Sequence, residues 1–144
     1  MRVAGILPCS FVNGYGSRYV VFAQGCVHHC PGCQNPETWD FKGGKEMTAE
    51  EIAADFRKRR LLDGITLSGG DPFCQQEACM ELLDLLPGVN VWIYTGYEFE
   101  DICDTPLAKR ADVLVTGKFV EPLRCEGKMY GSCNQRIIRR SEDG

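Results

Sequence analysis

Long apolar runs are missing from this sequence. None of its apolar stretches approaches the ~18 residues that a membrane-spanning helix requires, and residues 1–16 contain no apolar core of a secretory signal. A surplus of positive charge is missing too, because 16 Lys and Arg stand against 20 Asp and Glu, which gives a net charge of −4. This balance argues against general binding to nucleic acids. We therefore expect a cytoplasmic protein that contacts neither membranes nor nucleic acid.

Internal repeats, low-complexity segments and linkers are also absent from the sequence. Its 144 residues have the usual length of one domain, and we predict a single domain over residues 1–144. Cysteine, in contrast, is abundant, with nine in the chain. An odd number of cysteines without a secretory signal is not typical of a disulfide framework, so we expect free thiols that are able to bind a metal.

Three of the cysteines lie in one short stretch, with the spacing Cys26-x3-Cys30-x2-Cys33. They follow an apolar run at 19–23 that is typical of a strand, so the loop leaving this strand would bring three thiolates together. Structural zinc sites have four protein ligands, often from two Cys-x2-Cys pairs, and the second pair is missing here. The two histidines inside the loop are poorly placed to complete a tetrahedron with their immediate neighbours. Zinc with a distant fourth ligand remains an alternative.

A [4Fe–4S] cluster is the other site that three neighbouring cysteines indicate. With three thiolate ligands, one iron has no protein ligand and can bind a small molecule, whereas electron-transfer ferredoxins saturate their irons with cysteine. We therefore predict a cluster that takes part in chemistry, and we expect it to be sensitive to oxygen.

Strand and helix patterns alternate along the chain. We predict strands at 2–7, 18–24, 64–68, 89–94, 112–116 and 136–139, and helices from 48 to about 62, at 75–86 and at 99–103. The first helix begins with a capping box, because Thr48 is a suitable N-cap and Glu51 follows three residues later. Met47 and Ile52 occupy the positions of a hydrophobic staple. The alternation indicates βαβ units and therefore an α/β fold with a mainly parallel sheet.

Glycine follows four of the predicted strands, at Gly25, Gly69-Gly70, Gly96 and Gly117. In α/β folds, ligands bind at the carboxyl ends of the parallel strands, so we expect these four loops to converge on the site. A full eight-unit barrel takes ~250 residues, and this chain is much shorter. We therefore predict an open, partial (βα) barrel with a lateral gap that a substrate or partner covers.

The cysteine motif resembles the signature of radical S-adenosylmethionine (SAM) enzymes. This resemblance implies that Cys26, Cys30 and Cys33 hold a [4Fe–4S] cluster and that SAM chelates the fourth iron. In many members an aromatic residue precedes the third cysteine and packs near the adenine, but this chain has Gly32 there. Adenine contacts are then expected from the backbone of Gly32, Cys33 and Gln34, or from elsewhere in the chain.

The stretch Ser-Gly-Gly-Asp-Pro at 68–72 resembles the glycine-rich motif of the same superfamily. Taken alone, Gly-Gly-Asp-Pro is more often only a turn. Its place at the end of the next strand after the cysteine motif supports the resemblance. The resemblance implies that Gly69, Gly70 and Asp71 border the methionine end of SAM, where the missing Cβ atoms permit close approach.

The motifs resemble, more narrowly, the activating enzymes of anaerobic (class III) ribonucleotide reductase. The matching segments occur in order and span nearly the whole chain: Asn13–Arg18, Phe22–Cys26, Cys30–Trp39, Leu67–Phe73, Tyr94–Tyr97, Asp112–Val115 and Gly131–Arg136. The resemblance implies that a 5′-deoxyadenosyl radical from SAM removes a Cα hydrogen from one glycine of the reductase. It also implies the reductase as protein partner and a reducing electron donor such as a flavodoxin. Two residues depart from the family's pattern, since Tyr15 replaces its usual Pro and Thr116 an Asp that is often present.

Two alternatives stay open at this point. One is another small radical SAM enzyme, such as a different glycyl-radical activase or a deazapurine-forming synthase. The other is a zinc- or iron–sulfur-binding interaction module without catalysis. Among the enzymes, the C-terminal segment 131–136 favours the activase of the reductase.

Overall fold

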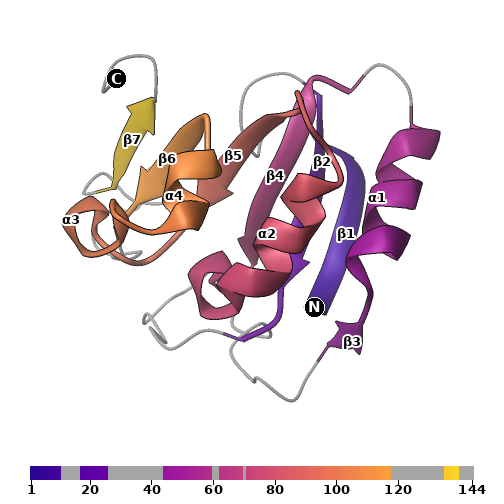
Figure 1. Cartoon of the computed structure of the whole chain (residues 1–144), viewed down its shortest axis with the longest axis horizontal. Coiled ribbons are helices and arrows are strands. Elements are labelled where there is room, and N and C mark those ends of the chain that lie inside the picture. The colour runs from indigo at the N-terminus through magenta and orange to yellow at the C-terminus, as the bar shows by residue number, and fades with distance from the viewer. Residues whose placement is uncertain (11–16, 26–43, 60–61, 70, 118–134, 140–144) are drawn as a thin grey trace.

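Seven strands form one sheet in the order β3-β1-β2-β4-β5-β6-β7 (Figure 1). The computed structural model describes residues 1–10, 17–25, 44–59, 62–69, 71–117 and 135–139. The strands are β1 (Arg2–Ser10), β2 (Arg18–Ala23), β3 (Lys45–Glu46), β4 (Gly64–Gly69), β5 (Asn90–Tyr94), β6 (Val113–Thr116) and β7 (Arg136–Arg139). The central strands β2, β4, β5 and β6 are parallel, β1 is antiparallel to both its neighbours, and β7 is antiparallel to β6. The predicted α/β class with a mainly parallel sheet is confirmed at the centre of a mixed sheet.

Three helices cover one face of this sheet: α1 (Ala49–Lys58), α2 (Gln76–Asp84) and α4 (Pro106–Arg110) (Figure 1). The main core lies beneath them, where Ile52, Leu82 and Leu107 pack with the buried strand residues Ile65 and Ile93. A smaller apolar cluster on the sheet consists of Trp92, Val113 and Val115. Two further helical turns are the 3₁₀ helix η2 (Pro72–Gln75) and α3 (Phe99–Ile102). None of the helices among the described residues is long and apolar enough to cross a membrane.

The N-terminus of α1 has the capping box that the sequence predicts. The Thr48 hydroxyl accepts from the Glu51 backbone N–H at 3.1 Å, and the Glu51 carboxylate accepts from the Thr48 N–H at 3.5 Å. Ile52 is fully buried and Met47 packs against the same core. The helix ends earlier than the predicted residue 62, because Arg59 adopts an extended conformation after the last turn.

Removing this cap should lower the stability of the whole domain modestly. We expect Thr48→Ala to reduce the free energy of unfolding by about 1 kcal/mol, because the Glu51 backbone N–H loses the hydroxyl that accepts its hydrogen bond. Chemical denaturation followed by circular dichroism measures this change. Thr48→Ser, which keeps the hydroxyl, is the control, and an equal loss in both variants would contradict the role of the cap.

Several element boundaries differ from those predicted. The helix predicted at 75–86 begins instead as the 3₁₀ turn η2, because the Asp71 carboxylate caps Phe73 and Pro72 occupies the first helical position. The α-helical part then ends at Asp84. Strand β1 extends beyond the predicted residue 7 to Ser10, with a register shift between Leu7 and Ser10.

Two elements were missed altogether. Helix α4 starts after Thr105, whose hydroxyl caps Ala108, and Pro106 follows at the first helical position. This Thr-Pro pair was a usable signal in the sequence. Strand β3 has only two residues and pairs with Arg2 and Val3, which no local pattern indicates. The turn predicted at 13–16 lies outside the described residues.

Candidate functional site

The carboxyl ends of the four parallel strands are joined to one another by hydrogen bonds. The Asp71 N–H, after β4, donates to the carbonyl oxygen of Gly25, after β2, at 2.9 Å. The Gly96 N–H, after β5, donates to the Asp71 carboxylate at 3.0 Å. The Gly117 N–H, after β6, donates to the carbonyl oxygen of Tyr97 at 2.9 Å. The predicted convergence of these loops is therefore present.

Asp71 is the centre of this arrangement, and its side chain is fully buried. Its carboxylate accepts from the Phe73 N–H at 3.0 Å, from the Gly96 N–H at 3.0 Å and from the Thr95 hydroxyl at 2.9 Å. A buried carboxylate is tolerated where its lone pairs are satisfied, as they are here. Because its acceptors point at the protein's own donors, Asp71 fixes the β4 and β5 loops rather than offering a free charge to a ligand.

Gly69 ends β4 with a backbone φ of +98°, which favours glycine. A Cβ atom at this position would lie 2.4 Å from the backbone nitrogen of Ala23 and 2.6 Å from its carbonyl oxygen. The close pairing of β2 with β4 therefore already requires glycine here. This pairing brings the loop after β4 beside the end of β2, from which the cysteine-bearing segment departs.

The three motif cysteines Cys26, Cys30 and Cys33 lie outside the described residues, as do Gly32, Gln34 and Gly70. What the structure describes is their frame, because Gly25 precedes residues 26–43 and Gly44 follows them. Gly44 has a φ of +74°, and a Cβ atom there would lie 2.6 Å from the Val3 carbonyl oxygen and 3.0 Å from the side chain of Gln24. Both ends of the cysteine-bearing segment are thus packed against the start of β1 and the end of β2.

The cysteines that the structure describes are free thiols, at positions 9, 74, 79 and 103. Cys79 is fully buried in the core, and burial raises the pKa of its thiol to about 12, with the charge of Asp71 acting in the same direction. A thiol this hard to deprotonate packs as a small apolar group. Within the described ranges, no group of His, Cys, Asp and Glu side chains could hold a metal ion.

Thr95, Thr116 and Gln75 at this edge were not identified from the sequence as site residues. Thr116 ends β6 fully buried, and its hydroxyl oxygen has no hydrogen-bond partner among the described residues. A buried hydroxyl without a hydrogen-bond partner is rare in folded proteins. A hydroxyl before a strand-end glycine was the available signal for Thr95 and Thr116. Gln75 carried no signal of this kind.

Comparison with known proteins places this site in a family. Residues 12–138 match a family model described as a 4Fe–4S single cluster domain. An anaerobic ribonucleoside-triphosphate reductase-activating protein of Enterobacteria phage T4 is 39% identical over 95% of this chain and 93% of its own length. The proteins of the same name from Salmonella typhi and Escherichia coli K12 are 38% and 37% identical, over 95% and 90% of this chain and 97% and 93% of their own. The chain belongs to this family of activating proteins. The family predicted from the motifs and the predicted iron–sulfur cofactor are both confirmed.

Proposed function

We propose that this chain is a glycyl-radical activating enzyme for an anaerobic ribonucleotide reductase. The observation that carries the proposal is the match to activating proteins of that reductase, which covers both the cysteine motif and the glycine-rich loop. When bound, the [4Fe–4S] cluster, reduced by an external donor, would supply the one electron that cleaves SAM to methionine and a 5′-deoxyadenosyl radical. That radical takes a Cα hydrogen from one glycine of the reductase, which yields 5′-deoxyadenosine and a glycyl radical.

We assign the cluster to Cys26, Cys30 and Cys33. This donor set fits the group, because three thiolates ligate three irons and leave the fourth for the amino and carboxylate groups of SAM. The hydrogen bond from Asp71 to Gly25 supports the assignment, since it joins the loop after β4 to the residue that precedes Cys26. The chain's own work is to hold these groups in place and to exclude water, because the cofactors supply the radical chemistry.

We assign the methionine end of SAM to the loop of Gly69, Gly70 and Asp71, and adenine contacts to the backbone of Gly32, Cys33 and Gln34. The Asp71 carboxylate is occupied by internal donors, so its part is to shape the loop whose backbone faces the cosubstrate.

The open sheet also supports a macromolecular substrate. We propose that the parallel strands β2, β4, β5 and β6 are the start of a partial (βα) barrel of the radical SAM type. Its uncovered side would admit a glycine-bearing loop of the reductase. We further propose that a reducing protein such as a flavodoxin supplies the electron and that the enzyme works in the cytoplasm, where thiols stay reduced.

Electron paramagnetic resonance (EPR) on the chain mixed with the reductase tests this function. We expect the anaerobically reconstituted chain, a reductant and SAM to produce a glycyl radical on the reductase together with 5′-deoxyadenosine. Cys30→Ala should produce neither, because one iron ligand is removed. Formation of 5′-deoxyadenosine without a glycyl radical would indicate a different radical SAM enzyme. Stoichiometric zinc without cleavage of SAM would indicate a binding module.

A further inference from the structure

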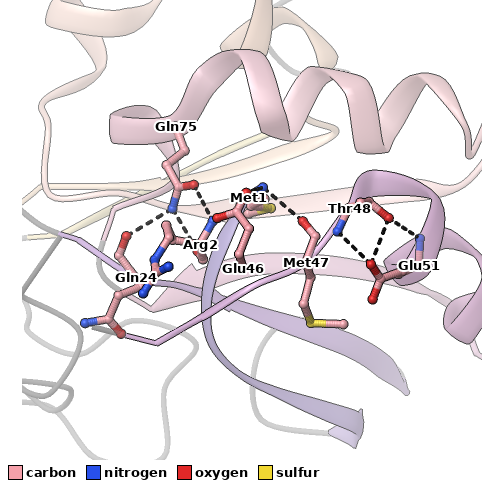
Figure 2. A network of polar contacts seen from close by, with 8 residues as sticks. All are labelled: Met1, Arg2, Gln24, Glu46, Met47, Thr48, Glu51 and Gln75. Carbon is pink, nitrogen blue, oxygen red and sulfur yellow. Dashed lines mark hydrogen bonds and ion pairs between the residues drawn. The ribbon is translucent and has the colours of Figure 1, made fainter. Parts of the chain in front are cut away.

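The side chain of Gln75 joins the start of β1 to the end of β2, from which the cysteine-bearing segment departs (Figure 2). Its Oε1 accepts from the Arg2 N–H at 2.8 Å. Its Nε2 donates to the Arg2 carbonyl oxygen at 2.8 Å and to the Gln24 carbonyl oxygen at 3.0 Å. With the amide flipped, its NH₂ group would face the Arg2 N–H and its oxygen would face the carbonyl oxygens of Arg2 and Gln24. The hydrogen bonds therefore determine the orientation of the Gln75 amide.

Arg2 extends this network to the far end of the segment. Its carbonyl oxygen also accepts from the Gln24 N–H at 3.0 Å, and its guanidinium donates to the Gly44 carbonyl oxygen at 3.2 Å. Residues 26–43 therefore leave from Gln24-Gly25 and return at Gly44, and both points are bonded to Arg2. Gln75 is the side chain that ties Arg2 and Gln24 to η2.

The segment from Asp71 to Gln75 consequently holds two consecutive carbonyl groups before Cys26. The Asp71 backbone N–H donates to the Gly25 carbonyl oxygen, and the Gln75 side-chain amide donates to the Gln24 carbonyl oxygen. The same segment follows directly on the glycine-rich loop at 69–71. Any displacement of Gln24 relative to that loop would break one of these bonds.

We propose that Gln75 is a positioning residue, which fixes the start of the cysteine-bearing segment against the glycine-rich loop and so sets where the cluster sits relative to SAM. This inference rests on the proposed function for the roles of the two loops. The bonds themselves join described residues from β1, β2 and η2. Residues that orient the ligands of a metal site typically change metal affinity or activity by about 10–100-fold when they are replaced.

The test is the rate at which the reconstituted full chain releases iron to a chelator, without SAM or reductase. Gln75→Met removes the hydrogen bonds but keeps a side chain of similar length. Gln75→Glu replaces the NH₂ group by a carboxylate oxygen, which faces the carbonyl oxygens of Arg2 and Gln24 and is repelled by them. We expect both variants to release iron about tenfold faster than the original chain. Gln76→Glu makes the same charge change one residue further along, and Thr105→Ala weakens the cap of α4. Both controls should keep the original rate.

Release at the original rate from both Gln75 variants would overturn the proposal. Faster release from Gln75→Glu alone would also overturn it, because the added charge would then be the cause. A Gln75→Met chain that fails to fold would show a purely structural role and would equally overturn the proposal. A chain that releases iron as expected but forms no glycyl radical on the reductase would refute the proposed function and leave the role of Gln75 in cluster retention intact. The EPR spectrum of the reduced cluster with SAM gives a second readout. Its lines should be broader in the Gln75 variants than in Gln76→Glu, because the cluster would then take a wider range of positions relative to SAM.

Discussion

Asp71→Asn should lower the free energy of unfolding by about 2–4 kcal/mol and reduce the yield of glycyl radical about tenfold or more. The fully buried carboxylate accepts hydrogen bonds from the backbone N–H groups of Phe73 and Gly96 and from the Thr95 hydroxyl. An asparagine of the same shape turns an NH₂ group toward one of these donors, so at least one backbone N–H or the Thr95 hydroxyl loses its acceptor without gaining water. The loop beside the cysteine-bearing segment then relaxes.

Denaturation curves and EPR on the activated reductase measure the two effects. Asp104→Asn is the matched control, because it makes the same charge change at an exposed position between α3 and α4. Thr95→Val in the Asp71→Asn background completes a double-mutant cycle, and the two losses should be less than additive, because they break the same bond. Additive losses, or a control as damaging as Asp71→Asn, would contradict the role assigned to this carboxylate.

The site was predictable from the sequence as far as local patterns determine it. Alternating strands and helices dictate that the carboxyl ends of parallel strands meet at one edge, so glycines at 25, 69, 96 and 117 identified loops that do converge there. The capping box at Thr48 and Glu51 was predictable for the same reason, because both partners lie within one turn. Three closely spaced cysteines likewise indicated the cofactor before any fold was known.

Residues whose roles depend on distant partners were not predictable. Gln75 bonds to Arg2, 73 positions away in the sequence, and nothing in the surrounding residues indicates this contact. Asp71 was predicted to border the cosubstrate, but its contact with Thr95 from the next strand depends on the register of β4 and β5. The burial of Arg18, at the start of the strand predicted at 18–24, has no local signal either, because charged side chains are rarely buried.

Arg18 is in fact buried at the opposite end of the parallel strands. Its guanidinium donates to the Thr66 hydroxyl at 2.8 Å, to the Ile65 carbonyl oxygen at 2.8 Å and to the Asn90 carbonyl oxygen at 3.0 Å. It also lies over the ring of Trp92, with the guanidinium carbon 5.7 Å from the ring centre. Burial lowers the pKa of Arg18, while the charge of Asp63 acts in the opposite direction.

Gly64 leaves the space that this guanidinium occupies. A Cβ atom at Gly64 would lie 2.6 Å from one terminal nitrogen of Arg18 and 2.5 Å from the Asn90 carbonyl oxygen. The side chain thus joins β2, β4 and β5 beneath the site, with a planar set of donors that matches three acceptors in fixed directions. Arg18 therefore contributes to the pairing of the strands whose carboxyl ends carry the converging loops.

Arg18→Met should therefore lower the free energy of unfolding by about 2–4 kcal/mol, because buried acceptors lose their donor and the shorter side chain leaves a cavity. Arg18→Lys should recover little of this loss, since a single ammonium cannot reach all three acceptors. Arg59→Met is the control: Arg59 forms an exposed ion pair with Asp55 at 3.2 Å, for which we expect less than about 1 kcal/mol. Urea denaturation of the three variants compares them directly. Full recovery by lysine would show that charge, rather than the planar set of donors, holds the three strands together.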